Sequence, residues 1–242
     1  MCTPSGRRGF SMIELLVTIG VIGVVMAILL PALSGGVGTA RRTASLANLR
    51  TIGQLVQQYA DQSADAYPWT RRGVNSCGIP VQFSPIWQMS SHWPLAMGGV
   101  IEMAELRGVM LSPGARRDDE TGVNPCIEPP SYTYSNSFLA DPRVWSGEGV
   151  ADDSLVRAVT LGMVAYPASK ALMWDWELPY VRRELRRAGP DLDERTPMLF
   201  ADGHGAEHRP SAATEAVDNP FVDGVPLERL HNTRNGVRGR DY

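Results

Sequence analysis

Residues 10–33 read FSMIELLVTIGVIGVVMAILLPAL, and this stretch decides how the chain is organised. Its only charged residue is Glu14, and residues 15–33 carry no charge at all. A helix that crosses a bilayer needs about 20 apolar residues, each of which contributes about 1.5 Å of length. Residues 10–33 therefore predict a membrane-spanning helix.

The residues on either side predict the orientation of this helix. Arg7 and Arg8 are the only charged residues among the first nine, and the positive-inside rule places such a basic flank in the cytoplasm. The rest of the chain would then be exported. A cleaved secretory signal peptide has a shorter apolar core that is followed by small residues. Here the apolar run is long and continues with helical periodicity, which favours a retained helix.

Glu14 is the exception within the apolar stretch, because a carboxylate inside a membrane segment costs about 2.5–3.5 kcal/mol on insertion scales. One alternative is a glutamate that is protonated or that snorkels to the interface. The surrounding sequence, RRGFSMIELL at residues 7–16, resembles the type IV prepilin signature. A basic leader ends in glycine, an aromatic residue follows, and an acidic residue lies four positions further on. Ser11 and Met12 replace the more usual Thr and Leu.

This resemblance implies a processing site and an assembly site. A prepilin peptidase/N-methyltransferase would cleave between Gly9 and Phe10, remove the leader (residues 1–9) and methylate the new N-terminus at Phe10. The resemblance further implies that Glu14 pairs with the N-terminal amine of a neighbouring subunit, since a buried charge is tolerated once it is paired. Pro31 lies where many pilins carry a helix-kinking proline, which lacks a backbone donor.

Residues 34–68 predict an amphipathic continuation of the helix. The stretch Ser34–Gly38 is a poor helix former, so we expect a bend or local melting there. From Thr39 to about Gln62 the apolar residues recur at steps of three and four, which is typical of a helix with one face on a core: Leu46, Leu49, Ile52, Leu55, Val56 and Tyr59. Tyr67-Pro68 ends this element, as it does in large pilin-like proteins.

Residues 69–242 read as an exported α/β head with long loops. Five segments have the composition of strands: Ile79–Phe83, Tyr132–Phe138, Ala158–Ala165, Ala171–Trp176 and Met198–Ala201. Pro94–Arg107 predicts a helix that Gly98 and Gly99 weaken. The tail 219–242 has few apolar anchors, so we expect it to be flexible. The fold class that follows is α+β and pilin-like, with a long N-terminal helix packed on an antiparallel sheet.

The segment Phe200-Ala201-Asp202-Gly203-His204 resembles the strand and turn of the H-X9-DG region in large pilin-like proteins. Leu192 stands where that pattern has its histidine, so the resemblance is partial. Asp202, His204 and His208 are candidates for a metal site, but the neighbouring glycines disfavour a helix that would present both imidazoles, so we expect a solvated turn and no metal. Calcium bound by Asp202 and loop carbonyls is the alternative. We expect no cofactor.

Composition and motifs argue against several other functions. The chain has 23 basic and 26 acidic residues and a net charge of −3, so no bulk attraction to nucleic acid is expected. It lacks the G-x-S-x-G, Walker A and dinucleotide-binding patterns. Cys2 would leave with the leader. Cys77 and Cys126 would lie in an oxidising compartment as a disulfide candidate, with two free thiols as the alternative.

Together these features predict a non-enzymatic, pilin-like or pseudopilin-like subunit of a type IV filament or a type II secretion pseudopilus. It would sit in the inner membrane as a single-pass protein with a cytoplasmic N-terminus, and later in a filament in the periplasm or at the cell surface. Its partners would be the prepilin peptidase and other pilin-like subunits. The alternative is a membrane-tethered exported enzyme or ligand-binding protein that uses the same export route. A lipoprotein is disfavoured because no cysteine closely follows the apolar run.

Overall fold

The computed structural model describes residues 10–74, 80–83, 85–115, 130–147, 151–181, 193–222 and 229–242, without the side chains of residues 31–35, 73 and 74. The chain divides into two units, Met1–Ala40 and Arg41–Tyr242. The second half of the long helix therefore belongs to the same compact unit as the sheet, which we call the head.

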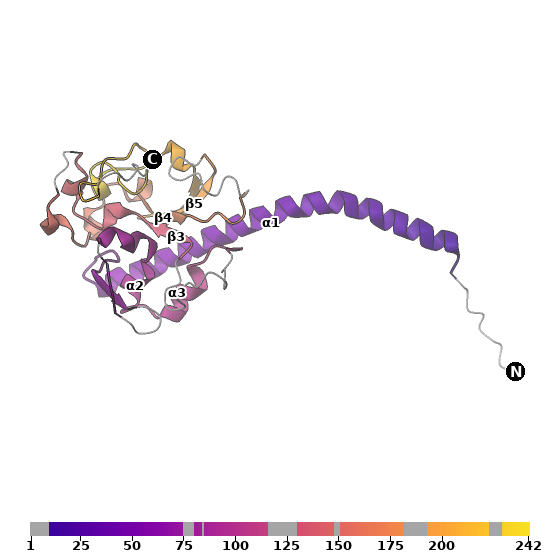
Figure 1. Ribbon diagram of the computed structural model, residues 1–242, viewed down its shortest axis with the longest axis horizontal. Coiled ribbons are helices and arrows are strands. Elements are labelled where there is room, and N and C mark those ends of the chain that lie inside the picture. Colours follow the sequence, from indigo (N-terminus) through magenta and orange to yellow (C-terminus); the bar gives the residue numbers. More distant parts are fainter. Residues whose placement is uncertain are drawn as a thin grey trace. The chain divides into compact units, whose positions relative to one another are not determined.

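Helix α1 runs from Met12 to Gln62 (Figure 1). It is not interrupted at residues 34–38, contrary to the expectation of local melting there. Glycine lowers helix propensity by about 1 kcal/mol relative to alanine, but it keeps both backbone hydrogen-bonding groups, so the helical ladder can continue through it. The helix ends where Ala64 and Asp65 adopt left-handed φ angles of 51° and 58°. The Asp65 N–H then donates back to the carbonyl of Ala60 at 3.0 Å, which caps the last turn.

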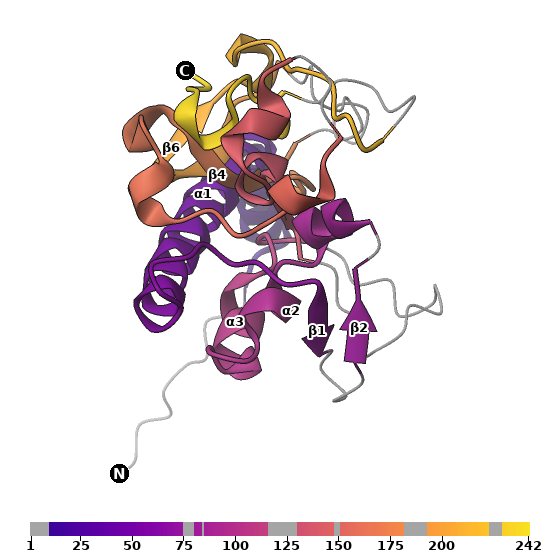
Figure 2. The same ribbon diagram turned by 90° about the vertical axis from the view of Figure 1, so that its left-hand side faces the viewer.

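The head contains a four-stranded antiparallel sheet in the order β3-β4-β5-β6. Its strands are β3 (Tyr132–Tyr134), β4 (Ala171–Asp175), β5 (Thr196–Phe200) and β6 (Gly205–His208). A two-stranded antiparallel sheet pairs β1 (Arg72–Val74) with β2 (Pro80–Gln82). Two short helices, α2 (Pro94–Met97) and α3 (Met103–Val109), pack nearby (Figure 2). The predicted α+β class, with a long helix on an antiparallel sheet, is confirmed.

The head portion of α1 packs directly on this sheet. Leu49 and Ile52 are fully buried, as the periodicity predicts. Gly53 and Gly205 allow the backbones to approach: a Cβ at Gly53 would lie 2.9 Å from Leu199 of β5, and a Cβ at Gly205 would lie 3.0 Å from Leu46. The apolar face of the helix and the sheet thus share one hydrophobic core. The burial of large apolar side chains in this core stabilises the packing of the helix on the sheet.

Three of the predicted segments contain strands at the predicted places, in β2, β4 and β5. Tyr132–Phe138 forms a strand only to Tyr134, and a short 3-10 helix follows. Ala158–Ala165 is not a strand, because it makes one isolated bridge from Thr160 to Ala66 and then a 3-10 turn. The predicted helix Pro94–Arg107 is split into α2 and α3, since the chain leaves the helical path after Gly98.

The C-terminal segment corrects another prediction. Residues 229–242 pack into the head instead of lying loosely on it, with Leu230 2%, Val237 0% and Asp241 1% exposed. The backbone N–H of Asp241 donates to Ser169 at 2.8 Å, and its carbonyl accepts from Thr214 at 2.9 Å. Backbone hydrogen bonds and a buried ion pair anchor this segment, so its scarcity of apolar residues was misleading.

Candidate functional site

The start of α1 is built around Ser11 and Glu14. The Ser11 hydroxyl accepts a hydrogen bond from the backbone N–H of Ile13 at 3.2 Å, and Glu14 Oε2 accepts one from the backbone N–H of Ser11 at 2.9 Å. This reciprocal arrangement closely resembles the capping box of a helix N-terminus, with the Ser11 hydroxyl bonded to the second helical N–H instead of the third. The Ser-x-x-Glu spacing is a capping signal that the sequence carries, whereas the prepilin resemblance gave Glu14 only a role in assembly. Glu14 therefore has an intramolecular partner within its own chain.

The apolar part of α1 has no partner within the described part of the chain. Met12–Leu30 is long and apolar enough to cross a membrane, and none of it is buried. Phe10, Ile13 and Leu16 are 75%, 71% and 67% exposed. Apart from Glu14 near its start, this segment is uncharged and apolar side chains cover all its faces, which is typical of a segment that lies in lipid or among other helices. Beyond its own chain neighbours and the helix backbone, a Cβ built at Gly20 or Gly23 meets no described atom within 4 Å.

The structure describes only some of the other predicted processing and assembly residues. Gly9 lies outside the described residues, while Phe10 directly precedes the capped turn of α1. Pro31 lies within α1, but its side chain is outside the description. Cys77 and Cys126 also lie outside the described residues, so the disulfide stays a prediction.

The structure brings Asp202 and His204 together in the turn between β5 and β6. His204 Nδ1 lies 2.6 Å from Asp202 Oδ1, and Gly203 takes a left-handed φ of 86° that suits glycine. The Phe200 ring stacks on His204 at 4.5 Å and meets His208 edge-on at 5.3 Å. Within the described ranges no group of three or more His, Cys, Asp or Glu residues could hold a metal ion. The imidazoles of His204 and His208 thus both pack against the ring of Phe200.

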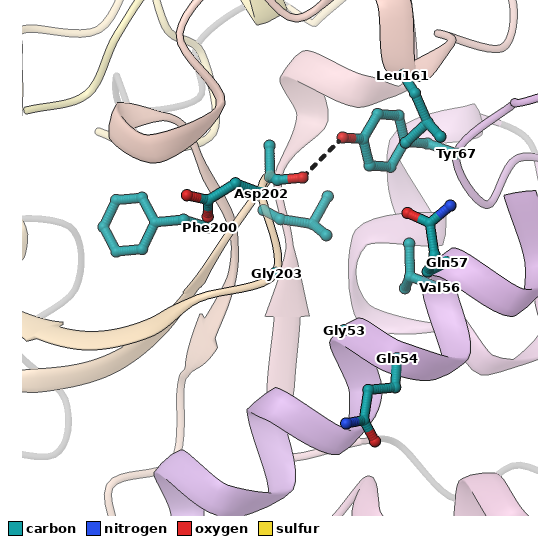
Figure 3. A pocket seen from close by; sticks show the side chains of 11 residues that line it. Gly53, Gln54, Val56, Gln57, Tyr67, Leu161, Phe200, Asp202 and Gly203 are labelled. Atoms are coloured by element: carbon teal, nitrogen blue, oxygen red, sulfur yellow. Dashed lines mark hydrogen bonds between the residues drawn. The ribbon is translucent and has the colours of Figure 1, made fainter.

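A shallow pocket lies between α1 and this turn (Figure 3). The Tyr67 hydroxyl donates to the carbonyl of Ala201 at 3.2 Å across it. Burial raises the pKa of Tyr67, with a smaller contribution from the charge of Asp202. Gln54, Gln57 and Asp202 supply the remaining polar side chains of its lining. Its lining residues include no histidine, cysteine or serine, so the pocket offers amide and carboxylate groups but none of the common nucleophile–base pairs.

Beneath the helix, a buried carboxylate joins α1 to the sheet. Asp175 Oδ2 accepts from the hydroxyls of Ser45 and Ser112 at 2.6 Å and of Tyr180 at 2.8 Å, while Oδ1 accepts from the Leu178 N–H at 3.1 Å. Burial raises the pKa of Asp175, although these hydrogen bonds oppose the shift. No sequence pattern indicates this cluster, because its members come from separate segments of the chain.

A second buried polar group holds the C-terminal segment. Lys170 is fully buried and pairs with Asp241 at 3.2 Å. Burial lowers the pKa of Lys170, and the neighbouring Asp241 carboxylate partly offsets that effect. His231 is 5% exposed, and burial, followed by the charge of Lys170, lowers its pKa to about 3. The only sequence signal for this site was that Lys170 is the single lysine in the chain.

Comparison with known proteins identifies one feature of the chain. Residues 4–30 match the family model described as the prokaryotic N-terminal methylation motif. The match includes Gly9, Phe10 and Glu14. No curated protein and no solved structure matches the chain. The matched motif indicates a type IV pilin-like protein that is processed by prepilin peptidase, and it favours a structural subunit over an enzyme.

Proposed function

We propose that the chain is a structural subunit of a type IV filament or of a type II secretion pseudopilus. The observation that carries this proposal is the combination of the methylation motif at residues 4–30 with a helix, Met12–Leu30, that is long and apolar enough to cross a membrane and carries no charge except Glu14. Such a helix suits two environments in turn. It can be stored in the inner membrane as a single-pass segment, and it can later pack among identical helices in a filament.

The processing step supplies the chemistry of assembly. Cleavage between Gly9 and Phe10 would remove Arg7 and Arg8 and leave a new α-amino group next to the capped turn of α1. In a packed bundle of apolar helices, an uncompensated Glu14 carboxylate is costly, and pairing it with the Phe10 amine of a neighbouring subunit satisfies both charges. The same pairing fixes the axial register between subunits.

The head holds its part of α1 firmly against the sheet. The Asp175 hydrogen bonds and the contact between Gly53 and Leu199 fix the head portion of α1 against the sheet. This supports a rigid connection between helix and sheet inside the head, as a subunit under mechanical load needs.

The pocket in Figure 3 supports the second candidate, a ligand-binding protein that uses the prepilin export route, because amide and carboxylate groups line it.

One experiment separates these two functions. Cells that express the epitope-tagged chain with its own prepilin peptidase are sheared, and the released material is pelleted and analysed by mass spectrometry. A subunit is recovered in the pelleted polymer with an N-methylated Phe10 as its first residue. A chain that is cleaved and methylated but stays wholly in the membrane fraction, in cells whose other pilins are assembled, would contradict the filament role.

A further inference from the structure

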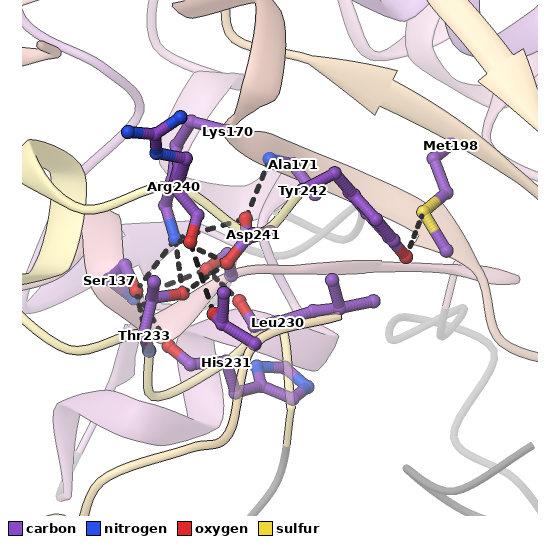
Figure 4. Close-up of polar contacts among 12 residues, drawn as sticks. Ser137, Lys170, Ala171, Met198, Leu230, His231, Thr233, Arg240, Asp241 and Tyr242 are labelled. Carbon is purple, nitrogen blue, oxygen red and sulfur yellow. Dashed lines mark hydrogen bonds and ion pairs between the residues drawn. The ribbon is translucent and has the colours of Figure 1, made fainter. Parts of the chain in front are cut away.

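Lys170 and Asp241 lie in contact within the head, away from solvent (Figure 4). Lys170 is 0% exposed and Asp241 is 1% exposed. The Lys170 Nζ atom lies 3.2 Å from both Oδ1 and Oδ2 of Asp241. This places the amine close to the carboxyl carbon between the two oxygens. A near-attack geometry needs the amine nitrogen and the carboxyl carbon about 3–3.5 Å apart, and the two oxygens that flank this carbon lie within that range of Nζ.

Each carboxyl oxygen of Asp241 also receives a donor from the protein. The backbone N–H of Ala171 donates to Oδ2 at 2.8 Å, and the Thr233 hydroxyl donates to Oδ1. Fixed donors at a carboxyl group stabilise the negative charge that develops on oxygen when a nucleophile adds to its carbon. Lys170 also donates to Thr233 and Ser137, so the amine is held in place by three partners.

The surroundings favour the neutral, nucleophilic form of the Lys170 amine. Burial lowers the pKa of Lys170, since a low-dielectric site disfavours the charged ammonium. A proton that passes from the ammonium to the carboxylate converts the ion pair into a neutral amine and a carboxylic acid. The Phe138 ring lies 5.9 Å from Nζ and adds to the apolar wall of the site. A site closed to water also disfavours hydrolysis of an amide formed there.

The presence of a lysine, and not an arginine, at position 170 is a second observation, independent of the geometry. The chain has 23 lysine and arginine residues, and Lys170 is the only lysine. Arginine is the usual residue for a buried ion pair because its planar guanidinium is weakly hydrated and binds carboxylates in a bidentate manner. A primary amine, by contrast, becomes a nucleophile once it is deprotonated. The single lysine of the chain thus occupies a position where a buried carboxyl group faces it.

We propose that Lys170 and Asp241 form an intramolecular amide bond, and that the head is therefore covalently cross-linked. The neutral Nζ amine adds to the carboxyl carbon of Asp241, and Ala171 and Thr233 hold the two oxygens. The nitrogen loses a proton, which goes to the departing hydroxyl, and one water molecule leaves. The overall change is amine plus carboxylic acid to amide plus water, with no oxidant or other reactant. The bond would join the start of β4 to the C-terminal segment.

A lysine-specific protease tests this directly, because the 242-residue chain has one lysine. Full-length protein is purified in detergent, denatured and digested. Acylated Lys170 is not a substrate, so we expect the wild-type chain to stay uncut. Tryptic mapping should then show one branched species in which the peptide that contains Asp241 is attached to Lys170 with the loss of one water. Complete cleavage after Lys170 in the wild-type protein would overturn the proposal.

Two variants serve as controls. Asp241→Ala removes the electrophilic carbon, so its denatured chain should be cut once, and this readout holds whether or not the variant folds. Asp193→Ala removes a surface carboxylate that pairs with Arg209 at 3.5 Å, so it should stay as resistant as the wild type. If Asp241→Ala is as resistant as the wild type, the protection has another cause and the cross-link is refuted.

Discussion

Gly53 of α1 lies against Leu199 of β5 so closely that a Cβ at position 53 would be 2.9 Å from Leu199 Cδ1. Leu199 is 0% exposed, so its side chain has little room to withdraw. The glycine therefore sets the distance between the helix and the sheet. A helix glycine is normally a cost in stability, and here the close packing of the core compensates for it.

Replacement of Gly53 by Val should destabilise the head. The branched side chain would overpack the interface, at a typical cost of about 1–3 kcal/mol. Denaturant unfolding of the full chain in detergent, followed by tryptophan fluorescence, measures the change. Gly108→Val in α3 is the matched control, because a Cβ built there meets no described atom within 4 Å beyond its own chain neighbours and the helix backbone. We expect that control to be neutral or to gain up to about 1 kcal/mol, and an equal loss in both variants would contradict the packing argument.

The sequence was most informative where one physical rule dominates. The apolar run at residues 10–33 and the three- and four-residue spacing from Leu46 to Tyr59 each predict a helix, and the structure contains it. The strands β4 and β5 were predictable because both are apolar runs that the sheet buries completely. The resemblance at Phe200–His204 also predicted a strand and a turn, and in the structure Asp202-Gly203 lies between the paired strands β5 and β6.

The sequence was least informative where the structure depends on distant partners. Asp175 looks like an ordinary strand-end aspartate until the fold brings Ser45 and Ser112 to it. The tail looks flexible in the sequence because its anchor is not local. Asp241 pairs with Lys170, which lies 71 positions earlier in the chain. Contacts of this kind leave no periodic pattern, so local rules cannot reveal them.

The buried Asp175 predicts a pH dependence of stability. Its folded-state pKa is raised above the value near 4 of an unfolded aspartate. As the pH rises from about 4 through the folded-state pKa, the folded chain still holds a proton that the unfolded chain has lost, so the free energy of unfolding decreases. Asp175→Asn should flatten this decrease, as measured by urea unfolding from about pH 4 to about pH 8, a range that starts at the unfolded pKa.

Asp175→Ala is the contrasting variant. It removes both carboxylate oxygens. Ser45 can still donate to the Tyr132 hydroxyl at 3.2 Å, but the buried Ser112 hydroxyl loses its Asp175 acceptor, at a cost of about 1–3 kcal/mol for an unsatisfied buried group. We expect it to be less stable than Asp175→Asn at every pH. An unchanged pH profile in Asp175→Asn would show that the carboxyl group does not titrate differently in the two states.

Cys77 and Cys126 should be linked in the exported protein. Both belong to the part of the chain that is predicted to enter an oxidising compartment, where paired cysteines commonly form disulfides. Peptide mapping without reduction should recover the two peptides as one species. Alkylation of both thiols in freshly isolated, unreduced protein would contradict the disulfide. Cys2 does not complicate the readout in the processed chain, because the leader that carries it is cleaved.

Gly9→Val should block processing. The peptidase must accommodate the residue next to the scissile bond, and a β-branched side chain there would obstruct the backbone. The uncleaved precursor should accumulate in the membrane and be detectable by its higher mass, whereas Gly9→Ala should be cleaved normally or more slowly. Recovery of a chain that begins at Phe10 from the Val variant would contradict this cleavage site.

Glu14 has two roles that one pair of variants separates: it accepts the Ser11 N–H within its own chain, and it is proposed to pair with the Phe10 amine of a neighbouring subunit. Glu14→Gln keeps an oxygen that can cap Ser11 but loses the charge, while Glu14→Ala loses both. Neither change adds a charge to the apolar segment, so membrane insertion should be unharmed. Cleavage should also persist, because the peptidase acts at Gly9-Phe10.

If charge pairing drives assembly, both variants should be processed at Phe10 and both should be missing from sheared filaments. If the cap is what matters, Glu14→Gln should assemble as the wild type does and only Glu14→Ala should fail. Mass spectrometry of the mature N-terminus and immunoblotting of the sheared fraction measure the two steps separately. A neutral amide lacks the charge that a carboxylate offers an ammonium group. Wild-type incorporation of the Gln variant would therefore refute the charge-pairing mechanism, while the assignment of the processing site would still stand.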